Sequence, residues 1–470
     1  MYYCLNENCL LRGWDKLPTG IVRRLSGQVA FLEPDLYTKI KDFGWMVFEG
    51  SPFLTDMQEK TLAMMAKHGI LDLCPSFRPL TEEQAYRLYP NRFLRSVHWA
   101  VTGRCNCRCR HCYMSAPSGH AGDYSHEECL RIIDQMEDAG IQSVSLTGGE
   151  ALIRRDFLEL AERLTRAGIR IETIMSNGLL VDENLLTRLK ELGQKPEFSM
   201  SFDGIGCHDW LRGVDGVEKK VLSAFALCAE HGFPTGSEYC LHRGNMAVFR
   251  ESVKLLGSLG CGSLKVNGLS LEGEALQIRD AAITPDEEYS FYLDYIPQFY
   301  EDGEPLRLML SGMFHSRGKG QAVIPFEKMP EGRDCGNYCL CGHARNQMYL
   351  SQDGYIVPCI PIGSVEKGRN CFPNIRDMTL SQALQDSFYM SFIDTRLNAY
   401  FDIHPECRAC EYRNRCAGGC RGNAAESGEL MARDQKACIF FRNGWYDRVK
   451  ELLQKLLPDP TPESERQNVH

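Results

Sequence analysis

Residues 96–299 alternate between short apolar stretches and longer amphipathic ones. The short stretches are typical of buried strands, and the longer ones have helical periodicity. A glycine follows almost every predicted helix, at the position where a C-cap often requires left-handed backbone. The pattern predicts an α/β domain of six β/α units, arranged as a partial barrel or as a doubly wound sheet. The predicted strands are 97–101, 143–146, 170–174, 197–201, 234–241 and 263–266, and the predicted helices are 125–139, 155–167, 183–192, 217–231 and 247–259.

The regions on either side of this domain have different patterns. Two short strands (21–25 and 28–32) and two helices (36–43 and 56–68) predict a small winged-helix-like α+β module at the N-terminus. The expected division is 1–80 for this module, 81–95 for a linker with one short helix, 96–310 for the barrel, 311–334 for a bridging region, 335–440 for a Cys-rich domain, and 441–470 for a closing helix (441–456) and a disordered tail.

Charge and composition limit the partners and the compartment. The formal net charge is −9 and long Lys/Arg runs are absent from the sequence, which argues against a nucleic-acid partner. No secretory signal opens the chain, and no apolar stretch reaches the ~20 residues of a membrane span. We therefore expect a cytoplasmic protein with no membrane partner. In that reducing compartment the 22 cysteines favour metal ligation over disulfides.

Three of these cysteines, Cys105, Cys109 and Cys112, directly follow the first predicted strand. A four-iron cluster is usually closed by four cysteines, so three would leave one iron open to a substrate or cofactor. A zinc loop is the alternative for this motif taken alone. In barrels of parallel strands the chemistry gathers at the carboxyl ends of the strands, and this loop falls there.

Short polar residues follow the next predicted strands. The second strand ends in Gly148-Gly149-Glu150, the third leads to Asn177, and the fourth ends at Ser201 with Asp203 nearby. The glycines would let backbone approach a ligand ammonium closely, and Glu150 would add charge. A lone Gly-Gly or Asn-Gly is usually a turn. Their order on successive strands instead indicates a ligand site along one edge.

Residues 96 to about 300 thus resemble the radical S-adenosylmethionine (SAM) enzymes. The resemblance implies that a catalytic [4Fe-4S] cluster binds SAM, cleaves it to a 5′-deoxyadenosyl radical and so abstracts hydrogen from a substrate. Cys107 and His111, which lie inside the loop, would not be ligands. The implied cluster ligands are Cys105, Cys109 and Cys112, and the implied SAM-binding residues are Tyr113, Gly148, Gly149, Glu150, Asn177, Ser201 and Asp203.

The C-terminal cysteines resemble the SPASM domain, which holds two auxiliary [4Fe-4S] clusters in peptide-modifying radical SAM enzymes. The chain would then carry three clusters, and Cys339 is a rival of Cys335 as a ligand. A structural zinc knot is the alternative for Cys407–Cys420. The resemblance assigns Cys335, Cys341, Cys359 and Cys420 to the first auxiliary cluster and Cys407, Cys410, Cys416 and Cys438 to the second.

The N-terminal module resembles the PqqD-like element that captures a leader peptide as an added strand; a purely structural cap is the alternative. The favoured function is a peptide-modifying radical SAM oxidoreductase that crosslinks a ribosomally made precursor peptide through a thioether, C–C or C–O bond. A flavodoxin or ferredoxin would supply the electron. The alternatives are a formylglycine-type maturase, an electron-transfer protein without catalysis, or an epimerase that returns hydrogen from Cys207, Cys240 or Cys261.

Overall fold

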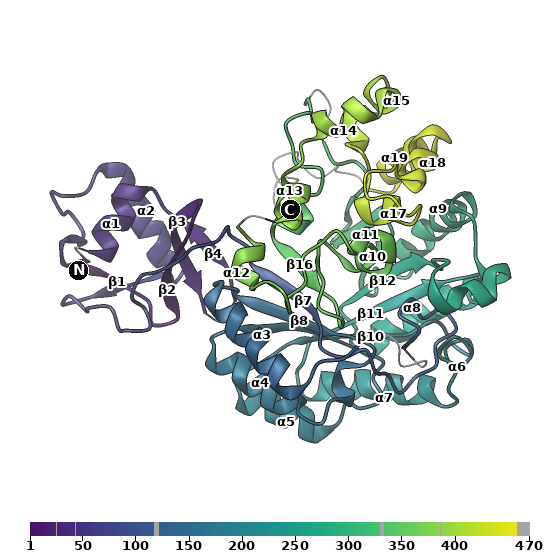
Figure 1. The fold of residues 1–470 in the computed structure, drawn as a ribbon, viewed down its shortest axis with the longest axis horizontal. Helices are drawn as coiled ribbons and strands as arrows, with labels where there is room; N and C mark the ends of the chain where they lie inside the picture. The colour runs from purple at the N-terminus through teal and green to yellow at the C-terminus, as the bar shows by residue number, and fades with distance from the viewer. Residues whose placement is uncertain (25, 43, 117–121, 330–332, 386, 458–470) are drawn as a thin grey trace.

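The computed structural model describes residues 1–24, 26–42, 44–116, 122–329, 333–385 and 387–457. A small N-terminal module stands beside a larger body made of a strand-and-helix domain and a Cys-rich C-terminal region (Figure 1). The predicted disordered tail lies outside the described residues.

All six predicted barrel strands are confirmed. They pair in parallel and in chain order, β7-β8-β9-β10-β11-β12, and β13 (Arg307–Leu310) continues the series. A doubly wound sheet would reverse its strand order at a switch point. The unbroken order therefore selects the partial barrel. The strands are β7 Ser96–Ala100, β8 Ser143–Thr147, β9 Arg170–Ser176, β10 Glu197–Ser201, β11 Thr235–Leu241 and β12 Ser263–Gly268.

Amphipathic helices cover the outer face of this sheet (Figure 1). Helix α4, for example, buries Phe157, Leu160 and Leu164 at helical spacing. Within the described part of the barrel domain, two α-helices were not predicted: α6 (His208–Arg212), which is very short, and α9 (Pro285–Glu301), which contains Pro297. The predicted helices are α3 His126–Asp138, α4 Phe157–Arg166, α5 Glu183–Glu191, α7 Val217–Glu230 and α8 Phe249–Ser258.

The N-terminal module is larger than predicted. Its two predicted strands correspond to β3 and β4, but β1, β2, β5 and β6 were missed. The predicted linker with a short helix is wrong, because Arg87–Tyr89 forms strand β6 beside β2 in the sheet β4-β3-β2-β6. The elements are β1 Tyr2–Leu5, β2 Cys9–Trp14, β3 Leu17–Arg23, β4 Val29–Phe31, α1 Pro34–Lys41, α2 Asp56–Lys67, β5 Leu71–Cys74 and β6 Arg87–Tyr89.

The N-terminal module contacts the barrel at the amino-terminal ends of the barrel strands. Gly27, between β3 and β4, lies against Gln142 and Arg170, which lie at the starts of β8 and β9. The ring of Tyr89 lies so close to Gly140 that a Cβ on that glycine would be 2.5 Å from it. The cysteine loop follows the opposite, carboxyl ends of the strands. The module and the cysteine loop are therefore at opposite ends of the barrel.

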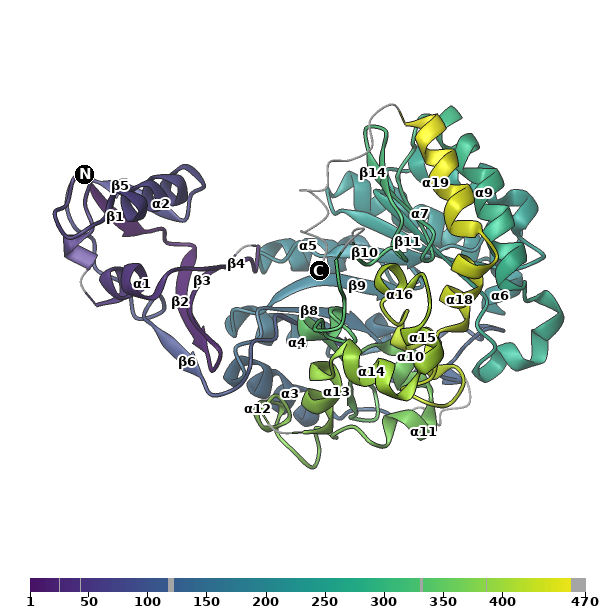
Figure 2. The same cartoon turned by 90° about the horizontal axis from the view of Figure 1, so that it is seen from above.

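The C-terminal region adds β16 (Gln347–Leu350) in parallel to β7 and then runs through short helices above the sheet (Figures 1 and 2). The bridging region forms a hairpin of β14 (Phe314–Gly318) and β15 (Gln321–Val323). The single closing helix that was predicted is two helices, α18 (Gln435–Arg442) and α19 (Trp445–Leu456). Gly444, with φ of 75°, separates them. Among the helices of the described residues, none combines the length and the apolar character that a membrane span requires.

Candidate active site

Neighbouring backbone holds the three-cysteine loop in place. The amides of Arg108 and Arg110 donate to the carbonyl oxygens of Arg212 and Leu211 at 3.0 and 2.8 Å. On the other side, Glu274 donates its amide to the carbonyl of Cys112 at 3.0 Å. The loop is not a regular helix or strand, yet the backbone on both sides of Cys109 is fixed.

Gly148 and Gly149 bring strand β8 against the backbone that leads into the loop. A Cβ on Gly148 would lie 2.2 Å from the carbonyl oxygen of Thr102, and one on Gly149 would lie 2.3 Å from that of Arg104. The amides of Gly149 and Glu150 donate to these same oxygens, each at 2.9 Å. The glycines therefore permit a backbone-to-backbone contact that positions the loop, a role that sequence reasoning missed.

Glu150 and Asn177 connect the ends of β8 and β9 to the loop. The buried Glu150 carboxylate accepts hydrogen bonds from the Ser176 hydroxyl at 3.0 Å and the Asn177 amide at 2.7 Å. Burial raises the pKa of Glu150. The Asn177 side chain donates to Asn106 Oδ1 at 2.7 Å. Two predicted SAM-binding residues thus lie beside the cysteine loop.

Asp203 is directed into the protein. Its fully buried carboxylate accepts from Arg212 Nε at 2.8 Å and from the Cys240 amide at 2.9 Å, and it contacts His208 Nδ1 at 3.0 Å. Burial opposes ionisation, but Arg212 and His208 outweigh it and hold the pKa of Asp203 well below its usual value. The assignment of Asp203 to SAM binding stays a prediction; in the structure its carboxylate holds Arg212, whose Nη1 also donates to Cys109 Sγ at 3.8 Å.

The loop thiols are chemically distinct. Hydrogen bonding from the buried Cys107 lowers the pKa of Cys105 and lowers that of Cys109 to about 6. The thiolate is the form that binds metal, so this environment favours ligation by Cys105 and Cys109, whereas burial raises the pKa of Cys112. The backbone amide of Cys107 donates to Cys105 Sγ at 3.4 Å. Burial raises the pKa of Tyr113 to about 12, which keeps its hydroxyl neutral.

Polar side chains line the inner wall of the barrel. Leu264 and Val266 are fully buried in the core, so Lys265 between them faces the opposite side of the sheet. Lys265 Nζ lies 3.6 Å from Glu238 on the neighbouring strand. A packed barrel fills this space with bulky apolar residues, whereas polar inward residues suit a ligand. By strand register, the inner wall contains the polar residues His98, Ser145, Ser199, Ser201, Glu238 and Lys265, together with Met175, Met309 and Tyr349.

The inner wall contains one predicted site residue, Ser201, paired in register with Glu238. Lys265 was not among the predicted site residues, although its place on a predicted strand would have assigned it to the inner face. Arg212, which follows the fourth strand, was also not among the predicted site residues.

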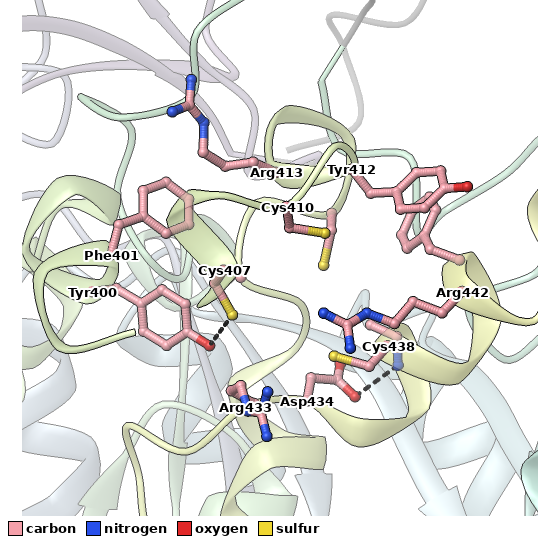
Figure 3. A pocket seen from close by; sticks show the side chains of 14 residues that line it. Tyr400, Phe401, Cys407, Cys410, Tyr412, Arg413, Arg433, Asp434, Cys438 and Arg442 are labelled. Carbon is pink, nitrogen blue, oxygen red and sulfur yellow. Dashed lines mark hydrogen bonds between the residues drawn. The ribbon is translucent and has the colours of Figure 1, made fainter. Parts of the chain in front are cut away.

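Four C-terminal cysteines, which the SPASM resemblance groups together, line one cavity (Figure 3). They come from α15 (Pro405–Arg408), the turn after it, α16 (Arg413–Cys416) and α18. The cavity, with a volume of about 30 Å³, also borders Arg413, Arg442 and Asp434. The side chains of Cys407, Cys410 and Cys438 point toward its centre (Figure 3). The four cysteines are Cys407, Cys410, Cys416 and Cys438.

The other auxiliary cysteines fall into a group of three and two separate residues. Cys341, Cys359 and Cys420 are electrostatic neighbours: burial raises the pKa of Cys359, and the charges of Cys420 and Cys341 raise it further. Cys335 Sγ instead lies 3.7 Å from the Arg413 carbonyl oxygen, in an apolar cluster that Cys407 adjoins. Cys339 Sγ accepts from Arg345 and Arg396 at 3.3 and 3.1 Å. All four ligands assigned to the first auxiliary cluster, Cys335 included, stay predictions.

The donor sets fit iron–sulfur clusters chemically. A single ion needs several donors around one point, and in the described part of the chain no group of three His, Cys, Asp or Glu meets that requirement. In a four-iron cluster each thiolate binds a different iron, so the thiolates are spread apart. Three thiols at the strand ends and four around a cavity suit that arrangement.

Comparison with known proteins identifies two domains. Residues 99–256 match the Radical SAM superfamily, and residues 339–411 match the SPASM iron-sulfur cluster-binding domain. The AdoMet-dependent heme synthase of Oleidesulfovibrio alaskensis is 28% identical over 357 residues, which cover 72% of this chain and 86% of that protein. The PqqA peptide cyclase of Granulibacter bethesdensis is 26% identical over 345 residues, with the same two coverages.

Solved structures share the fold. Streptococcus suis SuiB bound to precursor peptide SuiA superposes with a TM-score of 0.60 at 16% identity, covering 93% of this chain and 99% of that chain. The structure of anSMEcpe with AdoMet and the Cp18Cys peptide gives a TM-score of 0.57 at 20% identity, covering 77% of this chain and 99% of that chain.

The chain therefore carries a radical SAM domain joined to a SPASM domain, as predicted. It is a radical SAM enzyme whose cofactors are S-adenosylmethionine and [4Fe-4S] clusters.

Proposed function

We propose that this enzyme modifies a ribosomally made precursor peptide and joins two of its residues through a thioether, carbon–carbon or carbon–oxygen crosslink. The observation that carries the proposal is the N-terminal module, a small sheet with a free edge fused to the radical SAM barrel. The similarity to SuiB covers 93% of this chain, whereas the similarity to anSMEcpe covers 77%. The PqqA peptide cyclase and the SuiA-bound SuiB structure support a peptide as the substrate.

Strand β4 is the free edge that would receive the leader of the peptide. It pairs with β3 on one side and is terminal in the sheet. Arg23 N donates to Gln28 O and Leu32 N donates to Thr19 O, so by antiparallel alternation the amide of Val29 points away from β3. An extended peptide can pair with such outward amides as an added strand.

The peptide must then reach the other end of the barrel. From Ser143 to Thr147 strand β8 spans roughly 15 Å, and the module lies beyond its start. A fully extended chain covers at most about 3.5 Å per residue. The leader contact and the modified residue should therefore be separated by more than about five residues.

At the barrel mouth this chain's residues orient the reactants and exclude water. When bound, SAM and its cluster supply a one-electron cleavage that removes a hydrogen atom from the substrate. Asn177 and Glu150 hold the loop beside the strand ends, and Glu238 and Lys265 provide polar contacts for the peptide on the inner wall. The auxiliary cysteines would hold the clusters that accept the second electron as the crosslink closes, with a flavodoxin or ferredoxin as the external reductant.

Mass spectrometry tests this proposal directly. The enzyme, anaerobically reconstituted and reduced, is incubated with SAM and a candidate precursor peptide, for which a small Cys-rich or Gly-rich open reading frame beside the gene would be the first choice. A crosslink removes two hydrogen atoms from the peptide, whereas epimerisation leaves its mass unchanged. Tandem spectra then locate the bond. If no peptide product forms although SAM is cleaved, the peptide proposal fails.

Val29→Pro tests the leader site, because proline removes the outward amide while keeping an edge-compatible backbone. The variant should bind the peptide weakly yet cleave SAM at the wild-type rate when no peptide is added. Val29→Thr keeps the amide and serves as the matched control. Equal peptide affinity in all three proteins would contradict the β4 assignment.

A tetrapyrrole substrate is the second candidate, favoured by the 28% identity to the heme synthase. An iron porphyrin bound in the barrel would give a Soret band that shifts with the protein concentration. Binding and SAM-dependent modification of the porphyrin, with no change in any peptide, would support this candidate instead.

A further inference from the structure

A buried ion pair stands directly behind one of the predicted cluster ligands. Arg212, at the end of helix α6, donates through Nη1 to Cys109 Sγ at 3.8 Å. The same guanidinium reaches the Asp203 carboxylate through Nε at 2.8 Å and Nη2 at 2.7 Å. The Arg212 side chain is 10% exposed and that of Asp203 is 0% exposed. The contact with the thiol is therefore largely shielded from water.

The surroundings fix the guanidinium in that position. Asp203 is itself held by the Cys240 amide at 2.9 Å and by His208 at 3.0 Å. The carbonyl of Arg212 accepts the amide of Arg108, so the backbone and the side chain of one residue both hold the Cys109 segment. A Cβ on the following Gly213 would lie 2.2 Å from the Arg108 carbonyl, which shows how closely α6 approaches the loop.

We propose that Arg212, oriented by Asp203, is a positioning residue that sets the reduction potential of the SAM-binding cluster through its hydrogen bond to Cys109. Hydrogen bonds to cluster sulfurs and nearby charge are among the factors that set iron–sulfur potentials. A cationic donor stabilises the extra negative charge of the reduced cluster. Asp203 lies on the far side of the guanidinium and partly offsets that charge.

The arrangement predicts that removing the cation and removing the anion shift the reduction potential of the cluster in opposite directions. Removing the cation in Arg212→Met should make the cluster harder to reduce, so its potential should become more negative. Removing the buried anion in Asp203→Asn, which keeps the side-chain volume, should make the potential more positive. We expect a change of about tenfold in the ratio of reduced to oxidised cluster in each case, which corresponds to ~59 mV for one electron.

The experiment is a redox titration followed by electron paramagnetic resonance on the reconstituted full chain. The SAM-binding cluster is identified as the signal that changes when SAM is added, and no peptide is present. The measurement therefore does not depend on the proposed substrate. Iron content is determined for every variant.

Arg110→Met is the matched control. Arg110 lies in the same loop, but its guanidinium stacks on Trp210 and donates to the Trp210 carbonyl at 3.0 Å. This variant should keep the wild-type potential, and Arg212→Lys should restore part of the shift seen in Arg212→Met.

Shifts of the same sign in Arg212→Met and Asp203→Asn, or wild-type potentials in both, would overturn the proposal. If Arg212→Met does not retain iron, Asp203→Asn alone decides, and a wild-type or more negative potential in that variant overturns it.

Discussion

Gly148→Ala should uncouple strand β8 from the cysteine loop. Gly148 has φ of 145°, a backbone conformation that costs a non-glycine residue about 1–3 kcal/mol. The new Cβ would also lie 2.2 Å from the Thr102 carbonyl oxygen, where ordinary contacts begin at 3.4 Å. The backbone must therefore move by about 1 Å, and overpacking of this kind costs about 1–3 kcal/mol. Together these terms predict a loss of roughly 2–6 kcal/mol.

Urea unfolding of the iron-free protein measures this loss. Gly168→Ala is the matched control, because Gly168 also has positive φ (71°) but a Cβ there would meet nothing within 4 Å. The control should lose only about 1–2 kcal/mol, the left-handed backbone cost. Gly148→Ala should also bind less iron at the loop, since Thr102 leads directly to Cys105. Equal destabilisation of the two variants, with equal iron, would refute the argument from backbone contact.

Two further outcomes follow from the structure. Cys438→Ala should lower the iron content by one cluster, whereas the exposed Cys371→Ala should not; equal iron in the two variants would remove Cys438 from the ligand set. Burial lowers the pKa of His98 to about 4 in the folded protein, so the imidazole binds a proton more tightly in the unfolded chain. The free energy of unfolding should then fall as pH drops from about 6.5 toward 4, by roughly 3 kcal/mol, and His98→Gln should reduce that slope. If the free energy of unfolding of His98→Gln fell with pH as steeply as that of the wild type, this prediction would be contradicted.

The barrel could be predicted from the sequence because the strand-like stretches, the amphipathic stretches and the glycines after them all indicated the same β/α repeat. Short strand-like stretches alternated with longer amphipathic ones, and glycines marked the helix ends. The choice between a barrel and a doubly wound sheet needed the strand order, which only tertiary pairing reveals. Helix α9 was missed because Pro297 interrupts its pattern. Strand β6 was missed because Tyr89 is stabilised by tertiary contacts, with the Trp14 ring 5.7 Å away and Gly140 on the barrel.

The site could be predicted as far as spacing determines it. Cys407, Cys410 and Cys416 lie close together in the sequence, the SPASM resemblance adds Cys438, and the fold brings all four to one cavity. Asp203 has a sequence position that suits ligand binding. In the fold, however, its carboxylate is directed into the protein, where it accepts a hydrogen bond from Arg212 of α6. Cys335 is close in sequence to Cys341 yet lies against Arg413. Such contacts depend on elements far apart in the chain, which spacing cannot reveal.

The claim on which the account depends is that Cys105, Cys109 and Cys112 hold a cluster that cleaves SAM. The most direct test is to quantify 5′-deoxyadenosine after the reduced, reconstituted protein is incubated with SAM. The wild-type protein should form it, and the variant with alanine at all three positions should form none while keeping the iron bound by the C-terminal cysteines. Undiminished 5′-deoxyadenosine from the triple variant, or none from iron-loaded wild-type protein, would contradict the account.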